Sequence, residues 1–370
     1  MITLIQKGAP VRRPVTEAVS HRVATTPLRP ALGWLLAASL ALGSSATLAG
    51  QMPQGQVVTA DESGASLTHI HLAEGTSTTH AIAIAPHNVQ VSADGRYLLA
   101  VGEPAGHAHG DDGHGHGHGD EPGKLKVFDA GHFDGTPLAV IPVGSHPAHV
   151  VSDPAGQFAF VTNAGDASVS VVDLESREVV ATVGTGDYPH GLRLSPDGSE
   201  LYVANVADGS VSVIDTKTHE EVARIAVGEA PVQVGFTADG KQVYVSLRDE
   251  NRIAVIDTAS REVAATVEVN RLPIQVYGTP DSKLMLVANE GTSDDPDNRV
   301  SVIDTSTRQV VATYEVGAGA HGISIDDSGR FAFVTSLFDD SLSVIDLQAG
   351  EIVATHATGH GPNGVTWLAN

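Results

Sequence analysis

The chain has no cysteine, few aromatic residues and too little positive charge to balance its acids. Without Cys, a disulfide framework, a thiolate metal ligand and a thiol nucleophile are all excluded. There are 44 Asp and Glu against only 21 Lys and Arg, so the formal net charge is −23. A field of this sign repels phosphate backbones. It argues against nucleic acid as a partner and favours cationic partners, metal ions included.

Long hydrophobic runs are missing too. The most apolar segment, 31–42, is shorter than the roughly 20 residues that a membrane-spanning helix needs. Basic residues precede it and small residues follow it at 47–49, as in a secretory signal peptide with a cleavage site near Ala49. We therefore expect 1–49 to be a signal peptide and the remaining chain to be secreted, most simply into a periplasm, without membrane insertion. A permanent membrane anchor is the alternative.

What the chain has in abundance is repetition. A short segment that ends in Asp recurs as KVFD, SVVD, SVID, AVID, SVID and SVID at 126–129, 170–173, 212–215, 254–257, 301–304 and 343–346. Each is preceded by a second apolar segment, such as FAFVTN (158–163) or ELYVAN (200–205), and by a turn such as SPDG (195–198). Apolar and polar residues alternate, with Gly, Asp and Asn in the gaps. This pattern indicates four short antiparallel strands in each unit.

Four strands in a repeat of this length are typical of a β-propeller blade. Six full units run from 86 to about 357, and one further inner-strand segment remains at 362–367. At the other end, 56–60, 66–72 and 79–85 supply a second, a third and an outer strand without an inner one. The sequence therefore predicts an all-β fold over 50–370. It is a seven-bladed β-propeller of four-stranded antiparallel blades, closed by a composite N- and C-terminal blade.

The repeat resembles the YVTN family of propeller repeats, whose name is nearly spelled by YVAN at 202–205. The resemblance covers most of 86–370. It implies the propeller fold but says little about function, because this family serves many roles.

Two units are longer than the others, and both carry extra residues between their second and third strands. The extra piece GTSDDPDN at 291–298 has carboxylates for Ca²⁺ but not the spacing of an EF-hand. The insertion at 103–123 alternates His with Gly and acidic residues. Neutral imidazole suits Zn²⁺, Cu²⁺ and Ni²⁺, with carboxylates completing the shell. We expect this tract, rather than being a solvated linker, to bind metal through His107, His109, His114, His116, His118, Asp111, Asp112 and Asp120.

Alignment of the units predicts a second metal site. Equivalent positions of a propeller lie on one ring, and the first positions of the inner strands lie at the mouth of the central channel. In four units, His occupies the first or the second of these positions: His87, His149, His190 and His321. We expect the four side chains to converge there, on the face from which the His-rich insertion emerges. His87, His149 and His190 come from successive blades and can reach one ion, whereas His321 lies farther around the ring and either completes the shell or remains a neighbour. Three residues of the adjoining loops could complete the shell: His146, Asp187 and His360.

The sequence shows no catalytic grouping, since G-x-S-x-G, P-loop and H-E-x-x-H motifs are all missing. A secreted propeller with a His-rich tract is similar to the AztD-type periplasmic zinc metallochaperones. The similarity implies a zinc chaperone or scavenger, not an enzyme, that passes Zn²⁺ to the substrate-binding protein of a zinc ABC transporter. Two alternatives stay open. One is a scaffold that binds another protein, and the other is a metal-dependent lactonase- or esterase-like hydrolase.

Overall fold

The computed structural model of the chain describes residues 52–106 and 122–369. The predicted signal peptide and the His and Asp residues of the insertion lie outside these residues. Within them there are 28 strands and two single-turn 3₁₀ helices, Ala164–Asp166 and Arg248–Glu250. No helix in this part of the chain is long and apolar enough to cross a membrane.

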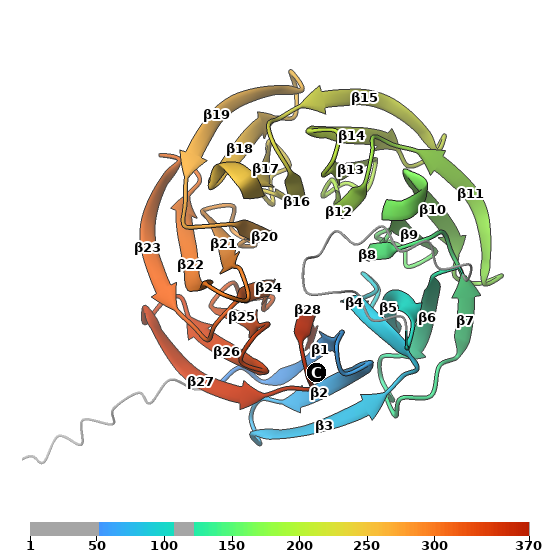
Figure 1. Cartoon of the computed structure of the whole chain (residues 1–370), viewed down its shortest axis with the longest axis vertical. Coiled ribbons are helices and arrows are strands. Elements are labelled where there is room, and N and C mark those ends of the chain that lie inside the picture. The colour runs from blue at the N-terminus through green and yellow to red at the C-terminus, as the bar shows by residue number, and fades with distance from the viewer. Residues whose placement is uncertain (1–51, 107–121, 370) are drawn as a thin grey trace, which may run out of the picture. The chain divides into compact units, whose positions relative to one another are not determined.

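The strands form seven antiparallel sheets of four strands each, arranged as blades around a central axis (Figure 1). From the innermost strand outward, blade 1 holds β4 (Ile84–Val91), β5 (Tyr97–Pro104), β6 (Lys124–Asp129) and β7 (Ala139–Pro142). Blade 2 holds β8 (Pro147–Ser152), β9 (Phe158–Asn163), β10 (Ser168–Asp173) and β11 (Glu178–Gly184). Blade 3 holds β12 (Pro189–Leu194), β13 (Glu200–Asn205), β14 (Ser210–Asp215) and β15 (Glu220–Ala226). Blade 4 holds β16 (Pro231–Phe236), β17 (Gln242–Leu247), β18 (Arg252–Asp257) and β19 (Glu262–Glu268).

The remaining strands complete the ring. Blade 5 holds β20 (Pro273–Gly278), β21 (Leu284–Gly291), β22 (Pro296–Asp304) and β23 (Gln309–Glu315). Blade 6 holds β24 (Ala320–Ile325), β25 (Phe331–Ser336), β26 (Ser341–Asp346) and β27 (Glu351–Ala357). The composite blade joins β28 (Pro362–Ala369) to β1 (Gly55–Asp61), β2 (Ser66–His71) and β3 (Thr76–Ala81). The predicted seven-bladed propeller and its closure are confirmed.

Closure depends on the pairing of β28 with β1, in which Trp367 lies opposite Val57 and Val365 opposite Thr59. The inner strand β28 also packs against the inner strands of both neighbouring blades, β24 and β4. Every blade is thus in contact with two others, and no blade face is left open.

The repeated sequence segments explain the blades. The second strand of each blade is covered on both faces by neighbouring blades, so β13 is apolar at successive positions and Leu201, Tyr202 and Val203 have no exposed surface. In blades 1 to 6 the third strand ends in an Asp that stops the strand. Asp215, for example, accepts hydrogen bonds from the backbone N–H groups of Lys217 and Thr218 at 2.9 and 2.8 Å.

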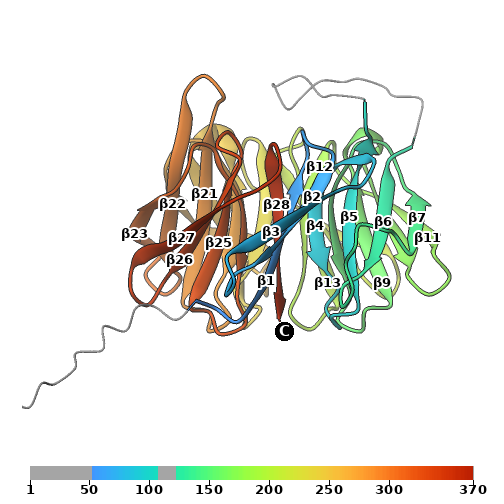
Figure 2. The same ribbon diagram turned by 90° about the horizontal axis from the view of Figure 1, so that it is seen from below.

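The structure corrects one detail of the sequence prediction. The outer strand of the composite blade was expected at 79–85 but is β3 at Thr76–Ala81, because the chain turns directly after His71, which pairs with Thr76. This strand is polar and exposed, so no apolar pattern marks it. The acidic piece at 291–298 extends the β21–β22 hairpin, which rises above the ring in Figure 2. Its Asp295 and Asp297 each lie 2.5 Å from an arginine, which favours a structural role over Ca²⁺ binding.

Candidate metal centre

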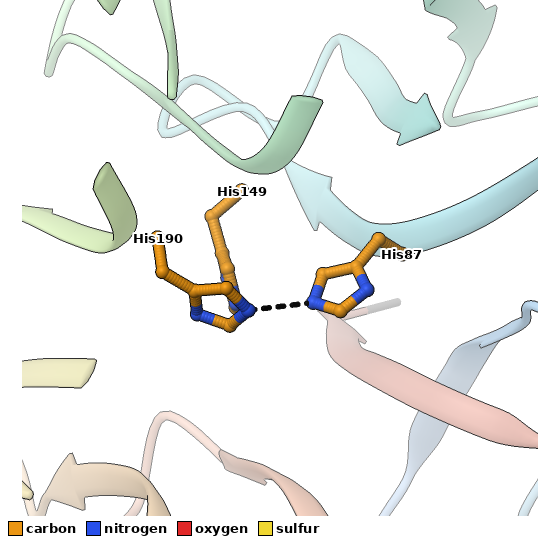
Figure 3. A group of neighbouring side chains, drawn as sticks. All are labelled: His87, His149 and His190. Carbon is orange, nitrogen blue, oxygen red and sulfur yellow. Dashed lines mark hydrogen bonds between the residues drawn. The ribbon is translucent and has the colours of Figure 1, made fainter. Parts of the chain in front are cut away.

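Three histidines from consecutive blades meet at one mouth of the channel (Figure 3). His87 lies on β4, His149 on β8 and His190 on β12, and one ring nitrogen of each lies within 4.8 Å of the others. The ring centroids are 4.9 Å apart for His87 and His190, 5.0 Å for His149 and His190, and 5.5 Å for His87 and His149. This group could hold a metal ion.

Local strand geometry turns these side chains into the channel. The pairing of each inner strand with its second strand shifts register just after an initial proline, between Pro86 and Asn88, between Pro147 and Val150, and between Pro189 and Leu192. A bulge of this kind releases a residue from the ladder and re-aims its side chain. Each of the three histidines occupies such a position.

Hydrogen bonds to Nδ1 fix the orientation of two of the rings. His190 donates from Nδ1 to the carbonyl of Val232 at 3.2 Å, and His87 donates from Nδ1 to the Glu62 carboxylate at 3.1 Å. The proton of His190 is therefore on Nδ1, and its Nε2 offers a lone pair. The Nε2 atoms of His87 and His190 are joined by a hydrogen bond of 3.0 Å across the cluster, and a shared cation would take the place of its proton.

The third ring is the most deeply placed. His149 is only 3% exposed, and its Nδ1 lies 3.4 Å from the side-chain nitrogen of Gln233. Thr162 ties the strands around it together, because its hydroxyl accepts from the His149 N–H at 3.0 Å and donates to the His190 carbonyl at 2.6 Å. These two hydrogen bonds fix the spacing between blades 2 and 3, and with it the positions of His149 and His190.

Burial keeps the imidazoles of His149 and His190 neutral. It lowers the pKa of His149 and of His190 well below the usual range, and the adjacent histidines lower both further. Neutral imidazole is the form that ligates a metal. The two rings are therefore ready to bind an ion at neutral pH without first releasing a proton.

His321, on β24, stands beside this group rather than within it. Its ring centroid is 6.5 Å from that of His87, its Nδ1 donates to the Asn363 carbonyl at 3.0 Å, and its Nε2 lies 3.3 Å from the Glu290 carboxylate. Burial, followed by the proximity of His87, lowers the pKa of His321 to about 4. Burial also raises the pKa of Glu290 to about 7.

The sequence analysis missed a ring of acidic residues. Glu62, Glu103 and Glu290 lie at or just beyond the ends of the second strands β1, β5 and β21. Each faces a histidine of the next blade, with Glu62–His87 at 3.1 Å, Glu103–His146 at 2.9 Å and Glu290–His321 at 3.3 Å. The equivalent positions of the other blades hold Ala164, Val206, Arg248 and Leu337. The same alignment of repeats, applied to the second strand, would have found these residues.

The other residues proposed for the shell point elsewhere. His146 pairs with Glu103, and the exposed His360 pairs with Asp340 at 3.1 Å. Asp187 is exposed in the loop before β12. The ends of the His-rich insertion are described, however. The N–H of Ala105 bonds to the carbonyl of Ala83 and that of Gly123 to Gly144, so the insertion starts and ends on the face that carries His87 and His149.

Fold and site together define a seven-bladed β-propeller with a histidine cluster at its channel mouth. The profile of the YNCE-like β-propellers matches residues 221–369, in keeping with the predicted YVTN-type repeats. A second profile, described as the cytochrome D1 heme domain, matches residues 57–277, more than half of the chain. The chain therefore belongs to the cytochrome D1 heme domain family.

One solved structure to which the chain is similar is the hydrazine synthase of Kuenenia stuttgartiensis. The two share 23% sequence identity with a TM-score of 0.62, over 76% of this chain and 89% of that one. At this identity the likeness shows a common fold. No curated protein sequence matches the chain significantly.

Proposed function

We propose that the protein is a periplasmic zinc chaperone or scavenger that holds Zn²⁺ on His87, His149 and His190. The observation that carries this proposal is the convergence of three ring nitrogens within 4.8 Å on a rigid channel mouth. Three nitrogen ligands with a fourth place open are a common arrangement for Zn²⁺. Imidazole also suits Cu²⁺ and Ni²⁺, so the identity of the metal is part of the proposal.

The surroundings of the three rings support tight binding. Glu62 and the Val232 carbonyl orient two of the ligands through Nδ1, as the outer-shell partners of metal sites do. Because the rings are already positioned by folded blades, binding an ion costs little ordering entropy. Glu62 also brings negative charge close to the site and offsets part of the charge of the ion.

Transfer follows from the open fourth place. We propose that the His-rich insertion collects Zn²⁺ and passes it to the cluster by exchange of one imidazole for another. Both ends of the insertion lie on the same face as the cluster, which keeps its ligands at high local concentration. The final acceptor would be the substrate-binding protein of a zinc ABC transporter, as in the AztD-type metallochaperones.

The family name raises the question of haem, and the cluster does not fit it. Haem iron takes its protein ligands along the axis perpendicular to the macrocycle. Here three rings with centroids 4.9 to 5.5 Å apart converge on one point, which leaves no space between them for a macrocycle. A single small ion matches this donor set.

A hydrolase is the second candidate. Zinc on three histidines can activate water, and Glu290, whose pKa is raised to about 7, is a carboxyl suited to exchanging a proton near neutral pH. Metal-dependent turnover of an ester or lactone would favour this reading over the chaperone.

The test is a zinc titration of untagged protein from which residues 107–120 have been deleted, monitored by competition with a zinc chelator. We expect one tight equivalent, lost in His149→Ala and in His190→Ala. His360→Ala removes an exposed histidine of a neighbouring loop and should leave the tight step unchanged. A tight step that survives in both cluster variants would place the metal elsewhere.

A further inference from the structure

A second polar feature of the channel lies away from the histidines. Arg193 follows His190 by three residues on β12, about 10 Å farther along the strand. The equivalent residue of the next inner strand, β16, is Gly235, and that of β20 is Tyr277. Because Gly235 has no side chain, Arg193 reaches past blade 4. Its guanidinium carbon lies over the Tyr277 ring, 5.5 Å from the centroid.

The guanidinium lacks a counter-charge. In the part of the chain that the structure describes, Arg193 has no carboxylate partner, and its one hydrogen bond goes from NH1 to the Leu192 carbonyl at 3.0 Å. Most other arginines within residues 52–106 and 122–369 pair with Asp or Glu, among them Arg261 with Glu200 and Arg330 with Asp346. Burial lowers the pKa of Arg193, because the surrounding protein disfavours its charge. Four of its five N–H donors thus remain for a ligand.

A cavity of about 210 Å³ lies against this side chain. Its walls are mainly apolar and aromatic and come from three consecutive blades: Leu194, Pro196, Phe236, Val276, Tyr277 and Pro280. Pro196, Ala238 and Pro280 belong to the turns that follow the inner strands β12, β16 and β20, neighbours in Figure 1. The cavity therefore opens on the face opposite to the histidines.

The lining selects a class of ligand. A guanidinium binds a carboxylate through two parallel hydrogen bonds, and its single positive charge neutralises the single negative charge of the carboxylate. A phosphate dianion would need further cations, and the rest of the wall offers none. The apolar walls would cover a compact hydrocarbon or aromatic body.

We propose that Arg193 and this cavity bind a small organic monocarboxylate with an apolar body, at a site separate from the histidine cluster. The carboxylate lies against the guanidinium, and the body lies between Phe236, Tyr277 and Pro280. The site needs no metal.

The test uses benzoate as the probe and calorimetric titration of the full secreted chain at constant ionic strength. We expect saturable binding of one benzoate per chain, weakened at least about tenfold in Arg193→Gln. Benzyl alcohol, which has the ring without the charge, should bind correspondingly weakly. Arg96→Gln is the matched control. It removes an exposed guanidinium that also lies over a tyrosine ring, 5.1 Å from the Tyr97 centroid, and should leave benzoate binding unchanged.

A second variant guards against misfolding of Arg193→Gln. Ala238 is exposed at the rim of the cavity, so Ala238→Trp should cover the opening without disturbing the core and should also abolish benzoate binding. Absence of saturable binding by the wild type, or binding that neither variant weakens, would overturn the proposal. Equally tight binding of inorganic phosphate would overturn the assignment to monocarboxylates.

Discussion

At the scale of single residues, Asp61 shows how one position of the repeat has changed. In blades 2 and 3 this place is held by Asn163 and Asn205, whose side-chain NH₂ groups donate to hydroxyls five and seven residues later. Asp61 instead accepts from Ser66 and Thr68 at the same spacings. Burial raises the pKa of this carboxyl to about 6, although these hydrogen bonds oppose the shift.

We predict that Asp61→Asn stabilises the protein above pH 6. The pKa of Asp61 is raised in the folded state, so its ionisation disfavours folding. This penalty is absent below the ordinary pKa of 3.8 and complete above about pH 6. The gain at pH 8 is roughly 3 kcal/mol at most. The difference in melting temperature between Asp61→Asn and the wild type should be larger at pH 8 than at pH 5. The exposed Asp187→Asn serves as the control, and a gap that does not shrink on acidification would contradict the prediction.

Glu62 is a second residue whose role depends on its neighbour. It accepts from His87 Nδ1, so Glu62→Gln should weaken zinc binding about 10- to 100-fold while leaving the fold intact. Glu103→Gln makes the same change beside His146, outside the cluster, and should have little effect. Equal zinc affinities for the two variants, measured by chelator competition, would show that Glu62 does not orient the ligand.

At the scale of strands and loops, prediction from the sequence succeeded where the pattern repeats. The second and third strands are buried and apolar in each blade, so their sequences recur and their register could be counted. The same counting brought His87, His149 and His190 to one place. It could not separate His321 from the group, because the outcome depends on how far each side chain reaches. It also misplaced β3, which is polar and exposed and therefore carries no signal.

The strand β28 is the element on which ring closure depends. Truncation after Gly361 would remove the partner of β1 and the Trp367 ring that stacks on Phe333 with centroids 5.2 Å apart. We expect the truncated protein to melt more than about 10 °C lower or not to fold, because β1 loses its strand partner and β4 and β24 lose the strand packed between them. Circular dichroism would measure this, with removal of only Ala369 and Asn370 as the control. An unchanged melting temperature would mean that closure does not need β28.

At the scale of the whole molecule, the three histidines of the cluster come from blades 1, 2 and 3. An ion bound to all three would act as a cross-link within the ring and would bind only the folded state. Zinc at about 100 times its dissociation constant should add about 2.7 kcal/mol of stability, a rise of a few degrees in melting temperature. A chelator should reverse this rise, and His149→Ala should abolish it. The same rise in that variant would assign the stabilisation to another site.

The closure of the ring also sets an order of events in folding. His87 is held by Glu62 from one end of the ring and lies 3.1 Å from the side chain of Asn363, which is 276 residues later in the chain. These three residues come together only once β28 has joined β1. The histidine cluster therefore acquires its final geometry after the most distant contact of the propeller has formed, so an incompletely folded chain cannot yet present the three rings in the mature arrangement.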